Sequence, residues 1–133
     1  MNVSTHPAPV KLAQRPASER YYGVDIAEDG ALVVAARPAG RAAPVLRYPA
    51  GAAGVTALSK QIALESAHPH VCIRSRGAVA LSLSMALIAL PGAEVTLVAP
   101  HAIERSVRSE QGVRADQPEE RAQRLAQLAE RMF

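Results

Sequence analysis

Short apolar runs separated by polar turns make up the first half of the chain. Their hydrophobic positions, rich in Val, Leu and Ala, predict strands at 21–26, 31–36 and 44–48. The sequence Glu28-Asp29-Gly30 between the first two runs is typical of a tight hairpin turn, because Asp-Gly accepts the positive φ angles that such a turn needs. We therefore expect the first three strands to form an antiparallel meander.

From residue 54 onward the apolar positions recur at helical spacing, and two further short strands interrupt them. The pattern predicts helices at 54–67, 78–90, 101–108 and 117–132. It predicts strands at 71–73 and 94–98. The helix 78–90 is apolar nearly all round, so it should be buried on more than one side or line an oligomer interface. In the last helix, Arg121 and Arg124 are expected on the polar face, opposite an apolar stripe.

This order of elements predicts an α/β fold with a mixed five-stranded sheet flanked by helices. The first three strands should be antiparallel, and the strands reached through helices should pair in parallel. That is the arrangement of the ribonuclease-H-like fold, in which the centre of the first strand and the end of the fourth come together. We expect residues 20–133 to form this domain, and residues 1–19, with three prolines and no continuous apolar run, to be a disordered leader.

Composition narrows the possible classes of protein. The chain has 133 residues, a net charge of +3 and one cysteine, so no internal disulfide can form. Its four histidines do not occur at the spacings of zinc ligands. The longest apolar stretch, 78–90, is shorter than the roughly 20 residues that span a bilayer. We expect a cytoplasmic protein with no membrane partner.

The most informative residue is Asp25, a carboxylate in the middle of the first apolar run. Val24 and Ile26 favour a half-buried strand, which normally excludes an aspartate. Asp25 could open an acidic metal site at the centre of the sheet. It could instead be a structural residue satisfied by an arginine or a backbone amide, which is the more common case for a buried polar group.

Five segments, taken in order, resemble a known family. They are Gly23-Val24-Asp25-Ile26, Gly54-Val55-Thr56-Ala57-Leu58, Val71-Cys72-Ile73-Arg74-Ser75-Arg76-Gly77, 95–100 and Arg114-Ala115-Asp116. Their order and intervals resemble the N-terminal RuvC-like DEDD domain of the insertion-sequence transposases that act as RNA-guided recombinases. The resemblance extends from about Tyr22 to the last residue.

The resemblance implies an acidic site, which this chain matches only in part. The family uses a carboxylate in the first strand, a Glu that closes the fourth, and two carboxylates around the start of the last helix. Asp25 corresponds to the first, Asp116 to the third, and Glu119 or Glu120 to the fourth. Where the family has Glu-x-Thr-Gly, this chain has Arg74-Ser75-Arg76-Gly77. The resemblance ends before the coiled coil and serine-bearing domain that follow in the family, and we expect this chain to lack them.

Replacement of the second acid predicts loss of the nuclease. Two-metal phosphodiester chemistry needs carboxylates that hold two Mg²⁺ ions about 4 Å apart. Arg74 would bring a permanent positive charge, bind Asp25 and compete with the cation. We therefore expect a degenerate, catalytically inactive transposase-like domain without a cofactor, which acts in nucleic-acid or protein binding.

Three alternatives stay open. An active Mg²⁺-dependent transposase or nuclease fragment would need a replacement acid, and Glu94 is the only one nearby in the sequence. A purely structural oligomerisation module would need no site at all. An actin-like ATPase fragment would use 25–30 as a phosphate loop, but Ala27 stands where a glycine is wanted.

Two kinds of partner follow from these expectations. DNA or RNA could bind at a group of arginines near the former active-site edge: Arg74, Arg76, Arg105, Arg108 and Arg114. With so few aromatic residues, such binding would consist mainly of phosphate contacts and would weaken with salt. A homodimer could form through the apolar stripe of the C-terminal helix and Phe133, unless that stripe packs on its own sheet.

Overall fold

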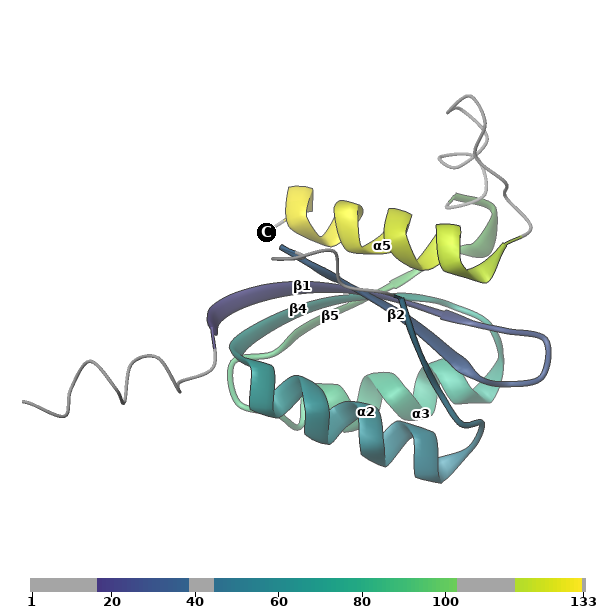
Figure 1. Ribbon diagram of the computed structural model, residues 1–133, viewed down its shortest axis with the longest axis horizontal. Coiled ribbons are helices and arrows are strands. Elements are labelled where there is room, and N and C mark those ends of the chain that lie inside the picture. Colours follow the sequence, from purple (N-terminus) through teal and green to yellow (C-terminus); the bar gives the residue numbers. More distant parts are fainter. Residues whose placement is uncertain (1–16, 39–44, 103–116, 133) are drawn as a thin grey trace, which may run out of the picture.

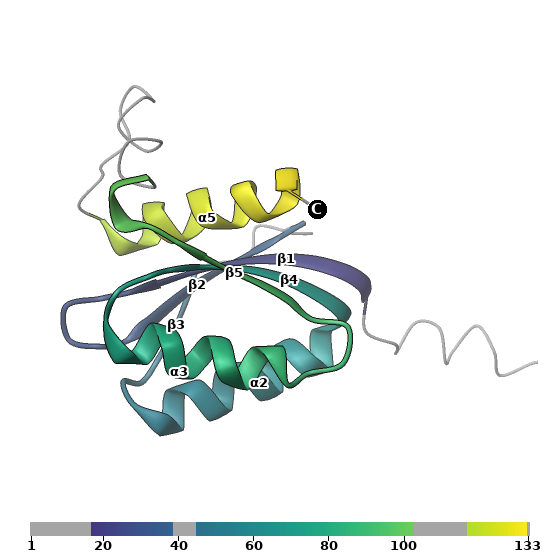
Figure 2. The ribbon, with the colours of Figure 1, turned by 180° about the vertical axis from the view of Figure 1, so that it is seen from behind.

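A five-stranded mixed sheet with helices on both faces forms the centre of the protein (Figure 1). The computed structural model describes residues 17–38, 45–102 and 117–132. Helices α2 (Ala52–Glu65) and α3 (Gly77–Ile88) cover one face, and α5 (Pro118–Met132) covers the other, as the view from behind also shows (Figure 2). Among the described residues, no helix is both long enough and apolar enough to cross a membrane.

The strands are β1 (Ala17–Ile26), β2 (Leu32–Arg37), β3 (Leu46–Tyr48), β4 (Ser66–Arg74) and β5 (Glu94–Val98). Their order in the sheet is β3-β2-β1-β4-β5, which differs from their order in the chain. β1, β2 and β3 are antiparallel neighbours, whereas β4 pairs with β1, and β5 with β4, in parallel. The crossover through α2 places β4 on the free side of β1, which makes β1 the central strand.

Side chains of β1 alternate between two different environments, because successive residues of a strand point to opposite faces. Tyr22, Val24 and Ile26 belong to the large core under α2 and α3. Gly23 and Asp25 face α5. One strand therefore supplies bulky apolar side chains to one layer and a glycine and a carboxylate to the other.

Gly23 sets how closely α5 approaches the sheet. A Cβ atom added there would lie 2.1 Å from the carbonyl oxygen of Ala122 and 2.3 Å from the backbone nitrogen of Ala126. Both alanines are fully buried, as are Leu125 and Ala129. The apolar stripe of α5 thus packs on the protein's own sheet, and it is not the free surface that a dimer through this helix requires.

The α/β class and the mixed five-stranded sheet flanked by helices are confirmed, but several predicted boundaries were wrong. β4 has nine residues rather than the predicted three, because α2 ends at Glu65 and the strand begins directly after it. β1 begins at Ala17, which pairs with Ser66, so residues 17–19 belong to the sheet and not to a leader. Backbone pairing needs no apolar alternation, and these polar segments therefore carried no strand signal. The predicted helix 101–108 lies mostly outside the described residues.

Candidate functional site around Asp25

Asp25 is the penultimate residue of β1 and has no exposed surface. Its side chain points toward the layer between the sheet and the first turns of α5. An ionised carboxylate in such a position needs strong compensating partners, because taking a charge out of water is costly. The fold provides them from two separate elements.

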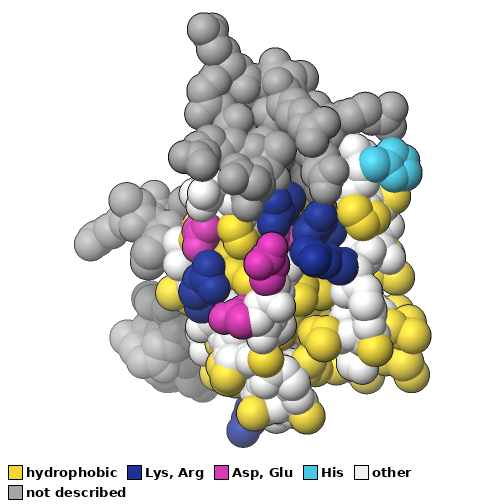
Figure 3. Space-filling model, turned by 90° about the vertical axis from the view of Figure 1, so that its right-hand side faces the viewer, with side chains coloured by type: hydrophobic (Ala, Val, Ile, Leu, Met, Phe, Trp, Pro, Cys, Tyr) yellow, Lys and Arg dark blue, Asp and Glu magenta, His cyan; other side chains and the backbone are white. Residues whose placement is uncertain are grey.

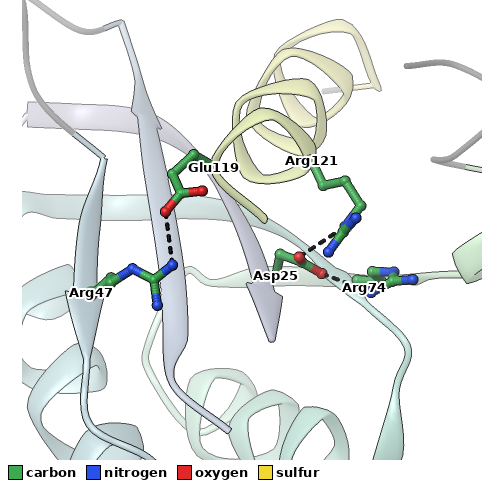
Figure 4. Close-up of polar contacts among 5 residues, drawn as sticks. All are labelled: Asp25, Arg47, Arg74, Glu119 and Arg121. Atoms are coloured by element: carbon green, nitrogen blue, oxygen red, sulfur yellow. Dashed lines mark hydrogen bonds and ion pairs between the residues drawn. The ribbon is translucent and has the colours of Figure 1, made fainter. Parts of the chain in front are cut away.

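Two arginines hold the carboxylate, one at each oxygen (Figure 4). Arg74 Nη1 donates to Oδ1 of Asp25 at 3.3 Å, and Arg121 Nε donates to Oδ2 at 2.9 Å. Both arginine side chains are themselves more than nine-tenths buried. The contact between Asp25 and Arg74 that the sequence predicted is confirmed, and a second arginine, Arg121, also binds Asp25.

Strand register explains why Arg74 reaches Asp25. Val24 in β1 is level with Ile73 in β4, so the following residues, Asp25 and Arg74, lie beside each other at the ends of two parallel strands. Neighbouring residues at the same level of a sheet project from the same face. Both side chains therefore enter the layer beneath α5.

Arg121 corrects the sequence-based interpretation of the last helix. It was expected on the polar face together with Arg124, but both side chains are buried. Arg121 directly precedes the buried Ala122 and lies one turn before Leu125, so it borders the apolar stripe, and its long side chain extends under the helix. Arg124 donates through Nη1 to the side-chain oxygen of Gln127. The sequence signal for this contact was the position of Arg121, one turn into the last helix and next to its apolar stripe.

One predicted acid, Glu119, pairs with an arginine outside the Asp25 cluster. Glu119, in the first turn of α5, accepts a hydrogen bond of 2.8 Å from Arg47 of β3, and this bond lowers the pKa of Glu119 below its usual range. Figure 4 shows Glu119 turned toward Arg47 and away from the Asp25 cluster. Glu120 is partly buried on the same turn, and Asp116 lies outside the described residues.

A magnesium site does not fit the side chains described here. Within 17–38, 45–102 and 117–132, no group of three or more His, Cys, Asp or Glu residues could hold a metal ion. Each oxygen of Asp25 already accepts from a guanidinium group, and Arg74 occupies the strand end where the family pattern has a glutamate. We derive no metal-dependent step from this site.

The predicted basic set is divided by the fold. Arg74 is buried in the ion pair, whereas Arg76, two residues beyond it, is exposed. Arg105, Arg108 and Arg114 lie outside the described residues. Figure 3 views the molecule from the side on which β1 and β4 end, and both basic and acidic side chains gather at the centre of this view.

Comparison with known proteins gives no family assignment. No protein-family model matches the chain, and no curated protein matches it. The likeness to RuvC-like domains therefore stays a prediction from sequence motifs.

Proposed function

We propose that this protein is a divergent RuvC-like domain with a ribonuclease-H-like fold that has lost its nuclease activity and binds nucleic acid through phosphate contacts. Three features support the fold assignment: the antiparallel meander, the central position of β1, and the parallel addition of β4 and β5 beyond it. The position of Asp25 beside the end of β4 supports it further, because the family's acidic site would lie there.

The observation that carries the proposal is the double ion pair of Asp25. A two-metal nuclease needs free carboxylate oxygens at this point to bracket the attacking and leaving oxygens. Here Arg74 and Arg121 occupy both oxygens of Asp25 and bring two permanent positive charges. A divalent cation would have to displace two buried guanidinium groups and would be repelled by them. The same arrangement satisfies the buried carboxylate and disables the chemistry.

Exposed positive charge near this end of the sheet supports nucleic acid as the ligand. Arg76 is exposed and follows Arg74, the last residue of β4, by two residues. The chain as a whole has a net charge of +3, and positive charge attracts phosphate groups. Three tyrosines and one phenylalanine in the whole chain leave little capacity for base stacking, so affinity should depend mainly on charge.

The loss of chemistry is tested with divalent cations and the full chain. Neither Mg²⁺ nor Mn²⁺ should raise the melting temperature, since a ligand that binds only the folded state would stabilise it by mass action. Neither ion should start cleavage of single-stranded or double-stranded DNA or RNA. Metal-dependent cleavage that Asp25→Asn abolishes would overturn the proposal and restore an active nuclease.

Nucleic-acid binding is tested by fluorescence anisotropy of labelled DNA and RNA at rising salt concentration. Affinity should fall steeply with salt, and Arg76→Glu should weaken it. Arg131→Glu is the matched control, because it makes the same charge change at an exposed position at the far end of α5. No binding at low salt, or an equal loss in both variants, would contradict a phosphate site beside Asp25.

A further inference from the structure

The two edges of the sheet are built differently. β3 forms one edge with only three residues, of which Arg47 is charged, and Pro49 follows them directly. Short length, a charge and a proline are features that keep an edge strand from pairing with another chain. β5 forms the other edge with the sequence Glu-Val-Thr-Leu-Val, in which the only charge is at the first position. The edge at β5 has a charge and a proline only at its two ends, Glu94 at the first position and Pro100 two residues beyond the last, so its centre is uncharged.

An apolar stripe on α3 runs beside this edge. Leu81, Met85 and Ile88 follow one another at helical spacing, and each is more than half exposed. None of the twelve residues of α3 is charged. Figure 2 shows α3 and β5 on the same side of the molecule, and Figure 3 shows hydrophobic side chains gathered toward that side.

Leu97 connects the stripe to the strand edge. It is paired with Ile73, which belongs to the core under α2 and α3, so Leu97 projects from the α3 face of the sheet. Its exposed fraction is nevertheless 44%. Leu97 and the stripe on α3 therefore form an exposed apolar region on one face of the sheet, next to the edge strand β5.

We propose that a second copy of this chain covers this region through antiparallel pairing of the two β5 strands about a two-fold axis at Thr96. In this register each Val95 lies opposite Leu97 of the other copy on the α3 face, and the two Thr96 residues oppose each other on the α5 face. Apolar and Thr–Thr cross-strand pairs are both favourable. The region is thus self-complementary, as an isologous interface requires.

Symmetry also accounts for the absence of charge along α3. Antiparallel joining of the two sheets places both α3 helices on the same face, where their stripes can pack against each other. Because no residue of α3 is charged, no like charges meet across the axis. The result is a continuous ten-stranded sheet across the dimer, with α3 helices adjacent at its centre.

Substitution of one exposed leucine on each edge strand tests whether the dimer forms through the β5 edge. Sedimentation of the full chain at micromolar concentration should give the mass of a dimer. Leu97→Lys should weaken the dimer about tenfold or more, because two lysines would enter one apolar interface. Leu46→Lys is the matched control, since Leu46 lies on the opposite edge strand and is 47% exposed, and this variant should stay dimeric. Met85→Glu provides a second disruption, on the helix, should Leu97→Lys fold poorly.

A cysteine at the proposed axis tests the register. Opposed residues of antiparallel strands have Cα atoms about 4.5–5.5 Å apart, which is within the range that a disulfide spans. Thr96→Cys should therefore form a covalent dimer under mild oxidation, whereas the unmodified chain, whose single Cys72 is buried, should not. A strictly monomeric mass, a dimer that survives both Leu97→Lys and Met85→Glu, or a dimer without a cross-link at position 96 would each overturn the proposal.

Discussion

The two faces of the central strand β1 illustrate two ways of stabilising one sheet. On the α2 and α3 face, Tyr22, Val24 and Ile26 pack into a large apolar core, and the hydroxyl group of Tyr22 donates a hydrogen bond to Glu65. On the α5 face, Gly23 allows a helix backbone to touch the strand, and Asp25 ties that helix to β4 through two ion pairs. The packing of the first face depends on filling its volume with apolar side chains. The packing of the second face depends on the close approach of a helix and on charge pairing. The second face should therefore tolerate substitution less well.

The largest effect is expected at Gly23. Gly23→Val would place Cβ within 2.1 Å of the Ala122 carbonyl oxygen, so the helix backbone itself has to move. We expect a loss of more than about 3 kcal/mol in the free energy of unfolding, above the usual cost of overpacking. Chemical denaturation followed by circular dichroism measures this change.

Gly77→Ala is the control for a glycine substitution without a clash. Gly77 has a φ angle of +74°, and a Cβ there would meet nothing within 4 Å. It should cost only about 1–2 kcal/mol, the strain of a left-handed residue. Equal losses in the two variants would show that α5 does not lie directly on β1.

The next effect concerns the charge cluster. Asp25→Ala leaves two buried arginines without their carboxylate, and we expect a loss of about 3–5 kcal/mol. Leu83→Ala on the other face, also fully buried, should cost about 2–5 kcal/mol through the cavity that it creates. Thermal and chemical denaturation of both variants give the comparison.

Additional substitutions distinguish the loss of a buried ion pair from the creation of a cavity. Replacing Arg74 and Arg121 by methionine in the Asp25→Ala background should recover part of the stability, because it removes the two buried guanidinium charges that Asp25 had neutralised. No substitution elsewhere should refill the cavity of Leu83→Ala to a comparable degree. Failure of the triple variant to recover stability would contradict ion pairing as the reason for the cost.

The smallest effect should appear at alkaline pH, where Cys72 on the α5 face and Tyr22 on the other face lose their protons when the chain unfolds. Burial raises the pKa of the Cys72 thiol to about 11 on the α5 face, and burial together with a hydrogen bond to Glu65 raises the pKa of Tyr22 above its usual range on the other face. The unfolded thiol ionises near pH 9, whereas the folded thiol stays protonated, so stability should fall as pH rises from about 9 toward 11.

Removing each group separates the two contributions. Cys72→Ala should make the stability curve flatter mainly below about pH 10, where the unfolded thiol is ionised to a greater extent than the unfolded tyrosine. Tyr22→Phe should flatten it mainly above about pH 10. The denaturant midpoints of the three proteins, measured across this pH range, give the comparison. Identical curves for Cys72→Ala and the unmodified protein would contradict burial of the thiol.

Local patterns of the sequence were sufficient for the α/β class and for most elements. Short apolar runs and period-3.6 hydrophobic spacing placed β2, β5, α3 and α5 within about two residues. The same patterns missed most of β4 and the start of β1, where polar residues pair through their backbones. Asp25 stood out as a carboxylate in an apolar strand, and its contact with Arg74 followed from the predicted neighbourhood of two strand ends.

Only the tertiary structure decided which residues complete the site and which surfaces stay open. Arg121 is 96 residues from Asp25, and its direction depends on how α5 is rotated on the sheet, which Gly23 and the small alanines determine through close packing. Glu119 pairs with Arg47 rather than with Asp25 for the same reason. Likewise, the stripe on α5 is buried while the one on α3 is exposed, although both are apolar in sequence. Hydrophobic periodicity indicates which face of an element is apolar. Long-range packing determines what that face contacts, and no local sequence pattern encodes this packing.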